Sequence, residues 1–232
     1  MNFIHANGFT AEVIRSKRRS ITIKVSEAKV YILVPELLDN ATINTIVAKK
    51  TRWIKTKLIL QQSVANLKPK AFIEGEHFLY LGQDYVLRII TGTRSTLIQQ
   101  NNELIATVSN KSPDPARLIN SLLLTWYKIQ ADLILKEKTH LYSKRIGVSP
   151  TDVIIKSFKA RWGSCTIHGV IHYNWHIIMA PEAIIDYLVV HELCHILHHN
   201  HSPAFWSAVA TYCPNYKDER AWLKLNGPRL SL

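Results

Sequence analysis

The stretch Val189–Trp206, VVHELCHILHHNHSPAFW, constrains this chain most, because it places five histidines and one glutamate within eleven residues. Residues i and i+4 of an α-helix lie one turn apart on one face. His191 and His195 are spaced in this way, so their imidazoles can bind one zinc ion. Glu192 lies about 100° further round the helix, where it can act as general base on a zinc-bound water without being a ligand.

The third ligand has to come from beyond the end of this helix. Because a helix rises about 1.5 Å per residue, His198 and His199 recede from an ion held by the pair, and we expect them to be solvated or hydrogen-bonded near the site. Asn200 can adopt the left-handed conformation that ends a helix, and Ser202-Pro203 is typical of the start of the next one. The turn between them holds His201. The predicted ligands are therefore His191, His195 and His201.

Glu219 is the rival for the third position, because some zinc peptidases take a glutamate from a later helix. It lies 24 residues after His195, in a candidate helix over 218–225. This alternative stays open on the sequence alone.

The periodicity of apolar residues predicts an α+β fold with a strand-rich N-terminal part. No internal repeat is apparent. The prolines of Lys111–Pro115 mark a boundary, so we expect an N-terminal basic region over 1–110 and a catalytic domain over 111–232. Strands are predicted at 20–25, 29–34, 78–81, 85–90, 96–99, 104–108, 153–158 and 170–179. Helices are predicted at 40–60, at 115–144, from 181 onward, and at 203–212.

Composition and cysteine usage indicate a cytoplasmic protein. No apolar run approaches the roughly 18 residues that span a bilayer, and the N-terminus lacks the order of a signal peptide. The cysteines are Cys165, Cys194 and Cys213, an odd number without C-x-x-C spacing, so a disulfide framework is not expected. Cys194 is interpreted as a small buried residue of the histidine helix.

The net charge of +12 is concentrated near the N-terminus. Residues 1–70 hold 13 basic and 4 acidic residues, a net of +9. Basic surfaces attract polyanions, so we expect weak, sequence-independent binding of DNA or RNA; the alternative is an ordinary solvated basic face. Trp53 could stack on a base, although a core position is the expected one. The residues expected to contribute are Arg18, Arg19, Lys50 and Lys57.

Several motifs together resemble one known family. They are the segments Ser16–Ser20, Trp53-Ile54, Gly75–Gly82, Arg161–Cys165 (RWGSC) and His191–Trp206. The chain resembles the YgjP-like predicted metal-dependent hydrolases, the "domain of unknown function 45" group, which is related to the SprT-like and WLM zinc peptidases. The resemblance covers most of the chain and implies a zincin-like fold with His191, His195 and His201 as ligands. It also implies that the RWGSC segment borders the active site; no role is carried over to His176.

Arg161–Cys165 has two interpretations from its residues. It can be a structural turn in which Gly163 supplies conformational freedom and Trp162 packs. Alternatively, Arg161 or backbone amides can face a developing oxyanion, as zinc hydrolases require. We expect structural roles for Trp162 and Gly163 and leave both possibilities open for Arg161.

The favoured function is zinc-dependent hydrolysis of a polypeptide, with Glu192 as general base. Zincin clefts lie along an edge strand that can pair with an extended chain. Two alternatives come from other classes: a metal-dependent hydrolase of nucleotide phosphoanhydrides, and a nucleic-acid-associated module with a structural zinc site. No glycine-rich phosphate loop supports the first, and no cysteine is placed to be a fourth ligand in the second.

Overall fold

A computed structural model describes residues 2–6, 8–65 and 69–232. The chain divides into two compact units, Met1–Lys68 and Pro69–Leu232. The predicted boundary at 110/111 lies later in the chain than this division. The reason is that the sheet preceding residue 110 shares one hydrophobic core with the helices that follow it. Among the described helices, none is long and apolar enough to cross a membrane.

The first unit is a four-stranded sheet covered by one helix. The strands are β1 (Asn2–Ala6), β2 (Phe9–Ser16), β3 (Thr22–Ser26) and β4 (Lys29–Pro35), in the order β1-β2-β4-β3, and the helix is α1 (Asn40–Ala65). β2 and β4 are parallel, and the other pairs are antiparallel. Alternate residues of β2 and β4 point into the core, which α1 completes. The buried core residues are Ala11, Val13, Val30, Ile32, Val34, Ile43, Val47 and Ile54.

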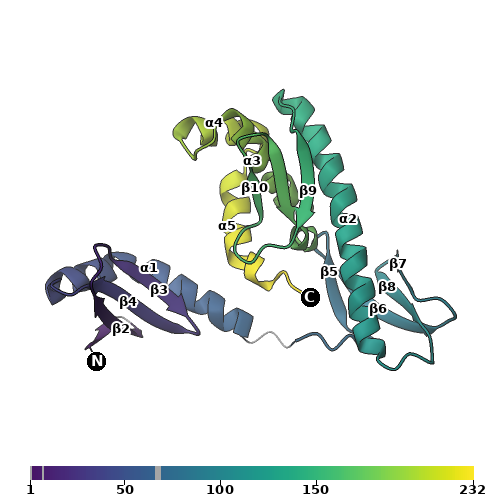
Figure 1. Cartoon of the computed structure of the whole chain (residues 1–232), viewed down its shortest axis with the longest axis horizontal. Coiled ribbons are helices and arrows are strands. Elements are labelled where there is room, and N and C mark those ends of the chain that lie inside the picture. Colours follow the sequence, from purple (N-terminus) through teal and green to yellow (C-terminus); the bar gives the residue numbers. More distant parts are fainter. Residues whose placement is uncertain (1, 7, 66–68) are drawn as a thin grey trace. The chain divides into compact units, whose positions relative to one another are not determined.

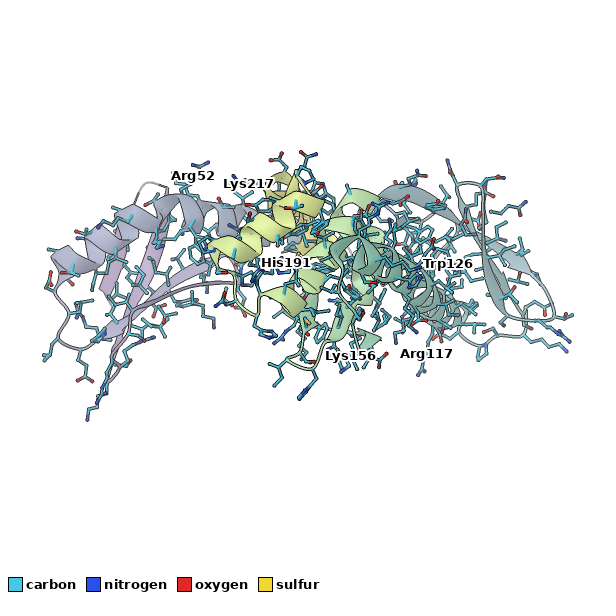
Figure 2. The ribbon with its side chains drawn as sticks, turned by 90° about the horizontal axis from the view of Figure 1, so that it is seen from above. Arg52, Arg117, Trp126, Lys156, His191 and Lys217 are labelled. Carbon is cyan, nitrogen blue, oxygen red and sulfur yellow. The ribbon has the colours of Figure 1, made fainter. Side chains whose placement is uncertain are left out.

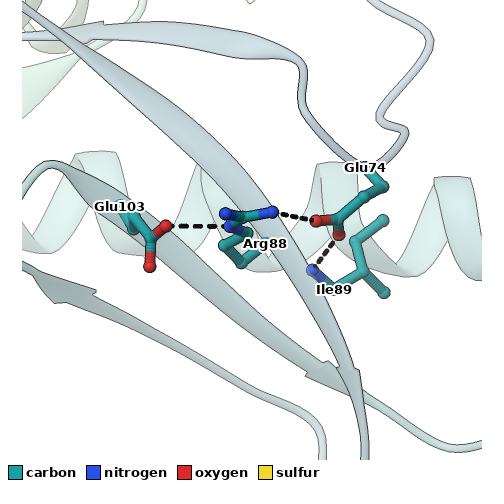
Figure 3. A network of polar contacts seen from close by, with 4 residues as sticks. All are labelled: Glu74, Arg88, Ile89 and Glu103. Atoms are coloured by element: carbon teal, nitrogen blue, oxygen red, sulfur yellow. Dashed lines mark hydrogen bonds and ion pairs between the residues drawn. The ribbon is translucent and has the colours of Figure 1, made fainter.

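The second unit opens with a sheet of the same topology. Its strands are β5 (His77–Tyr80), β6 (Gln83–Thr91), β7 (Thr96–Gln100) and β8 (Glu103–Val108), in the order β5-β6-β8-β7. An exposed ionic network ties the segment before β5 to this sheet (Figure 3): Arg88 donates to Glu74 and Glu103 at 3.0 and 2.8 Å, and Glu74 also accepts from the amide of Ile89. The topology therefore repeats, although no sequence repeat predicted it.

The long helix α2 (Pro115–Ile146) connects this sheet to the rest of the unit (Figure 1). Asp114 caps its first turn by accepting from the amide of Arg117, and Gly147 ends it with φ of 78°. Its C-terminal half packs on a three-stranded sheet of order β10-β11-β9 and on helix α3. Lys138 reinforces the α2–α3 contact through Glu182 and Asp186. The remaining elements are β9 (Asp152–Lys156), β10 (Gly163–Cys165), β11 (Val170–Asn174), η1 (Trp175–Met179), α3 (Glu182–Leu197), α4 (Pro203–Tyr212), α5 (Tyr216–Asn226) and η2 (Gly227–Arg229).

The architecture confirms the predicted α+β class and its strand-rich N-terminal part, with three local corrections. The strands β1 and β2 were not predicted. The predicted strand 170–179 ends at Asn174, and Trp175–Met179 form a 3-10 helix instead. The link expected to be a turn contains the short strand β10. The apolar run Trp175–Met179 is almost entirely buried, so the periodicity of apolar residues could not distinguish a strand from a 3-10 helix there.

Candidate metal centre

Helix α3 brings the predicted histidine pair to the boundary between core and solvent. Most of the helix is buried, including Val189, Val190 and Leu193, whereas His191 and His195 are half-buried. Figure 2 marks His191 on this helix. Nδ1 of His195 lies 3.1 Å from the carbonyl oxygen of His198. Because a carbonyl can only accept, this contact places the proton on Nδ1 and leaves Nε2 of His195 free to bind a cation.

The chain turns back toward the pair immediately after α3. The helix ends at Leu197, and His198 is extended with φ of −141°. Asn200 was predicted to end the helix in the left-handed conformation, but it has no positive φ, so that detail is wrong. Ser202 caps α4 as predicted by accepting from the amide of Phe205 at 3.3 Å. The short turn between the two helices holds His201.

The three predicted histidines converge on one point. Their ligand nitrogens all lie within 4.8 Å of one another, and Nε2 of His201 is 3.2 Å from Nε2 of His191. Two nitrogens at about 2.0–2.1 Å from one tetrahedral zinc ion lie about 3.3 Å apart. The separation therefore fits a shared metal ion. Burial lowers the pKa of His191 to about 3 and also lowers the pKa of His195, so both rings stay neutral, the form that binds metal.

The rival residues lie outside this cluster. The carboxylate of Glu219 accepts a hydrogen bond from the thiol of Cys213 at 2.6 Å, and it does not belong to the group of converging ligand atoms. His198 contributes only its carbonyl oxygen to His195, and His199 is exposed. Cys194 is buried, as predicted, and burial raises the pKa of its thiol to about 11.

Glu192 lies beside the cluster in a tight, dry position. The residue is 4 % exposed, and a Cβ added to Gly163 would lie only 2.5 Å from its Oε1. Burial raises the pKa of Glu192 to about 8, while the charge of Arg161 acts in the opposite direction. A carboxyl with a pKa near neutrality is matched to both accepting and returning a proton. The glycine of the RWGSC segment is thus required by the close approach of β10 to α3.

Asn174 fixes the segment that carries Arg161. Its side-chain amide donates to the carbonyl oxygens of Phe158 and Arg161 at 3.1 and 3.2 Å, and its backbone amide donates to that of Trp162 at 2.7 Å. The side chain of Asn174 is buried, so these bonds are shielded from water. Trp162 packs against Gly227, where an added Cβ would approach its ring to 2.8 Å. Sequence reasoning missed the role of Asn174, because the partners are 13 and 16 residues away.

Aromatic rings form the wall behind the histidines. The fully buried ring of Phe205 lies 5.0, 4.5 and 4.8 Å from those of His191, His195 and His201. Trp206 stacks on His201, with ring centroids 5.4 Å apart and an interplanar angle of 23°. Tyr216 stacks on Trp206, with ring centroids 5.3 Å apart and an interplanar angle of 16°. The exposed ring of His201 is therefore held between its contacts with Phe205 and Trp206. The sequence placed Phe205-Trp206 in a motif but did not predict these contacts.

Comparison with known proteins identifies the family. A family model described as the YgjP-like metallopeptidase domain matches residues 19–226. The chain belongs to the YgjP-like family. This confirms the resemblance drawn from the motifs, and it supports a metal-dependent hydrolase.

More distant comparisons add little. The metallopeptidase zymogen abylysin of Pyrococcus abyssi is 21% identical, and the match covers 39% of this chain and 94% of that one with a TM-score of 0.34. The metallopeptidase zymogen jannalysin of Methanocaldococcus jannaschii is 16% identical over 38% and 93%, with a TM-score of 0.33. Among curated proteins none matches the YgjP-like chain.

Proposed function

We propose that this YgjP-like chain is a zinc peptidase in which His191, His195 and His201 hold the metal and Glu192 is the general base. The observation that carries the proposal is the convergence of three imidazoles beside one buried carboxyl. Three nitrogen ligands leave one tetrahedral position open, as catalytic zinc sites do. Zinc, when bound, supplies a Lewis acid that lowers the pKa of a coordinated water toward about 7.

Glu192 supplies the proton transfer. Its carboxylate takes a proton from the attacking water and returns it to the nitrogen of the leaving amine. Burial favours the neutral acid of Glu192, whereas the charge of a bound metal ion would favour the ionised carboxylate. The two influences would therefore oppose each other on the pKa of Glu192. Gly163 leaves the carboxylate no room to rotate away on the β10 side.

The edge strand β10 offers a place for an extended polypeptide. β10 is the outermost strand of its sheet and pairs only with β11 within that sheet. A substrate strand can add to such an edge through main-chain hydrogen bonds. Because Gly163 of β10 touches Glu192, a chain paired there passes the general base. Arg161 is exposed and held by Asn174 at the start of this edge, where its guanidinium can stabilise the developing oxyanion.

The proposal is tested by offering the purified full-length protein three substrate classes side by side: casein, disordered peptides and nucleoside triphosphates. New amino groups report amide hydrolysis, and released phosphate or pyrophosphate reports phosphoanhydride hydrolysis. We expect amide hydrolysis that disappears with a chelator and returns with zinc. Nucleotide hydrolysis without any peptide cleavage would instead support the alternative enzyme class.

A further inference from the structure

The first unit carries a large positive charge that its own residues do not neutralise. Residues 1–68 hold 12 basic and 4 acidic residues. Within the described residues, every ion pair belongs to the second unit. One of the four acids, Asp39, is already engaged, since it accepts from the amide and hydroxyl of Thr42 at the start of α1. The lysines that the structure describes in this unit are therefore available to an anionic partner.

Three of these lysines surround a tryptophan on one side of α1. Taking 100° per residue, the buried Ile43, Val47 and Ile54 fall between about 0° and 40°. Lys49, Lys50, Trp53 and Lys57 fall between about 240° and 340°, and we call them the basic stripe. Lys49, Lys50 and Trp53 are exposed, and Lys57 is half-buried. Arg52 falls at about 180°, opposite the buried residues, and points away from the strands (Figure 2).

The exposure of Trp53 is a second observation, independent of the charge, that points to a ligand on this side of α1. A core position was expected for it, but the residue is 36% exposed and is not one of the buried core residues of this unit, so that expectation is wrong. Across the described residues, it has no ring or cation–π partner. Indole is the largest apolar side chain, and the exposed part of Trp53 is an apolar surface that a flat partner can cover.

The ammonium groups and the indole of the basic stripe indicate what kind of partner it can bind. Ammonium groups bind phosphates, and an indole between them can stack on a base, which a duplex keeps hidden and a single strand exposes. A membrane surface fits less well, because interfacial helices collect their apolar side chains on one face. The other exposed apolar residue in this half of α1, Ile59, lies about 120° away from Trp53.

We propose that the basic stripe binds single-stranded nucleic acid without sequence preference. The lysines contact consecutive phosphates, and Trp53 stacks on a base between them. Arg18 and Arg19 precede β3 and contribute long-range attraction in this proposal; the guanidinium of Arg18 already donates to the hydroxyls of Ser20 and Thr22. This binding does not depend on the metal centre or on the proposed peptidase activity.

The experiment measures fluorescence anisotropy of a labelled oligothymidylate with the full-length chain between about 50 and 200 mM salt. Three phosphate contacts on a single strand give a slope of log K against log salt of about −2. Lys50→Glu with Lys57→Glu should reduce that slope to about −0.7. Trp53→Ala should weaken single-strand binding roughly 5- to 150-fold, the loss of one base stack, while Trp53→Phe keeps most of it.

The matched control reverses Lys217 and Lys224 on α5, which are exposed and also seven residues apart. It makes the same change in net charge, and it should leave both the slope and the affinity close to those of the wild type. A duplex of the same length and anionic lipid vesicles complete the comparison, and circular dichroism confirms that each variant is folded. The proposal is overturned by absence of binding at the low-salt end, by equal losses in the α5 control, by a preference for duplex or vesicles, or by Trp53→Ala binding as the wild type does.

Discussion

Replacement of Gly163 by alanine is the perturbation whose effect follows most directly from the geometry. The added Cβ would lie 2.5 Å from Oε1 of Glu192 and 2.8 Å from its Cδ and Cγ. These separations are well inside van der Waals contact, so one of the two groups must move. β10 is held by its pairing with β11 and by Asn174, whereas the carboxylate is the end of a flexible side chain. The carboxylate of Glu192 is therefore the group that moves.

The cost of this movement falls on catalysis more than on stability. Overpacking of a core typically lowers the free energy of unfolding by about 1–3 kcal/mol. Because the side chain of Glu192 can rotate, we expect a loss of about 1 kcal/mol. A general base that is displaced from its position loses about 10²- to 10⁴-fold in rate. The three atoms nearest to the added Cβ all belong to Glu192 and none to a histidine, so we expect the zinc content not to change.

The assay compares kcat and bound zinc for Gly163→Ala and for its neighbour Ser164→Ala. Successive side chains of a strand point to opposite faces, so the Ser164 variant changes the same strand without approaching Glu192. We expect full zinc in both variants and a lost kcat in Gly163→Ala alone. Unchanged turnover by Gly163→Ala, or loss of its zinc, would refute the role that we assign to this contact.

Further predictions concern the ligands and the titration of the site. His201→Ala should lose zinc and Glu219→Ala should keep it, as measured by metal content after dialysis; the reverse pattern would make Glu219 the third ligand. Trp206→Ala should weaken zinc binding by about 10- to 100-fold in a chelator competition, and Trp206→Phe should lose less, because the stack on His201 orients that ring. In the metal-free protein, Glu192→Gln should raise the free energy of unfolding at pH 8 and have little effect on it at pH 4.5. The reason is that the folded-state pKa of about 8 lies above the ordinary value of 4.5, so the wild type loses stability as pH rises between these values. The loss is at most about 1.4 kcal/mol per pKa unit. The depressed pKa of His191, about 3, has the opposite consequence: metal-free protein should lose stability as pH falls from 6.5 toward 3, which urea unfolding at several pH values will show.

The cluster of three histidines could be predicted from the sequence because its information is local. The i, i+4 spacing fixes His191 and His195 on one face, and the helix break with Ser202-Pro203 leaves His201 in the turn. All three histidines lie within eleven residues, so helix geometry alone brings them together. The exception was the manner in which the helix ends, since an extended His198 rather than Asn200 makes the turn.

The surroundings of the centre could not be predicted in the same way, because they depend on contacts between distant segments. Gly163 meets Glu192 across 29 residues, and Asn174 supports Arg161 from a different strand. Strands β1 and β2 were not predicted, although the buried Ala11 and Val13 alternate with less buried residues along β2. Trp53 was assigned to the core by its residue type, although its place on α1 leaves it outside the core.

The central claim is that zinc held by three histidines and a proton transfer by Glu192 together hydrolyse a polypeptide. Its most direct test is the rate of amide-bond cleavage by Glu192→Gln at the same zinc occupancy as the wild type, on whichever polypeptide the wild type cleaves. Glutamine keeps the shape of the side chain but cannot accept the proton. We predict a loss of about 10²- to 10⁴-fold in kcat with zinc content unchanged. Cleavage by the zinc-loaded variant at the wild-type rate would contradict the account.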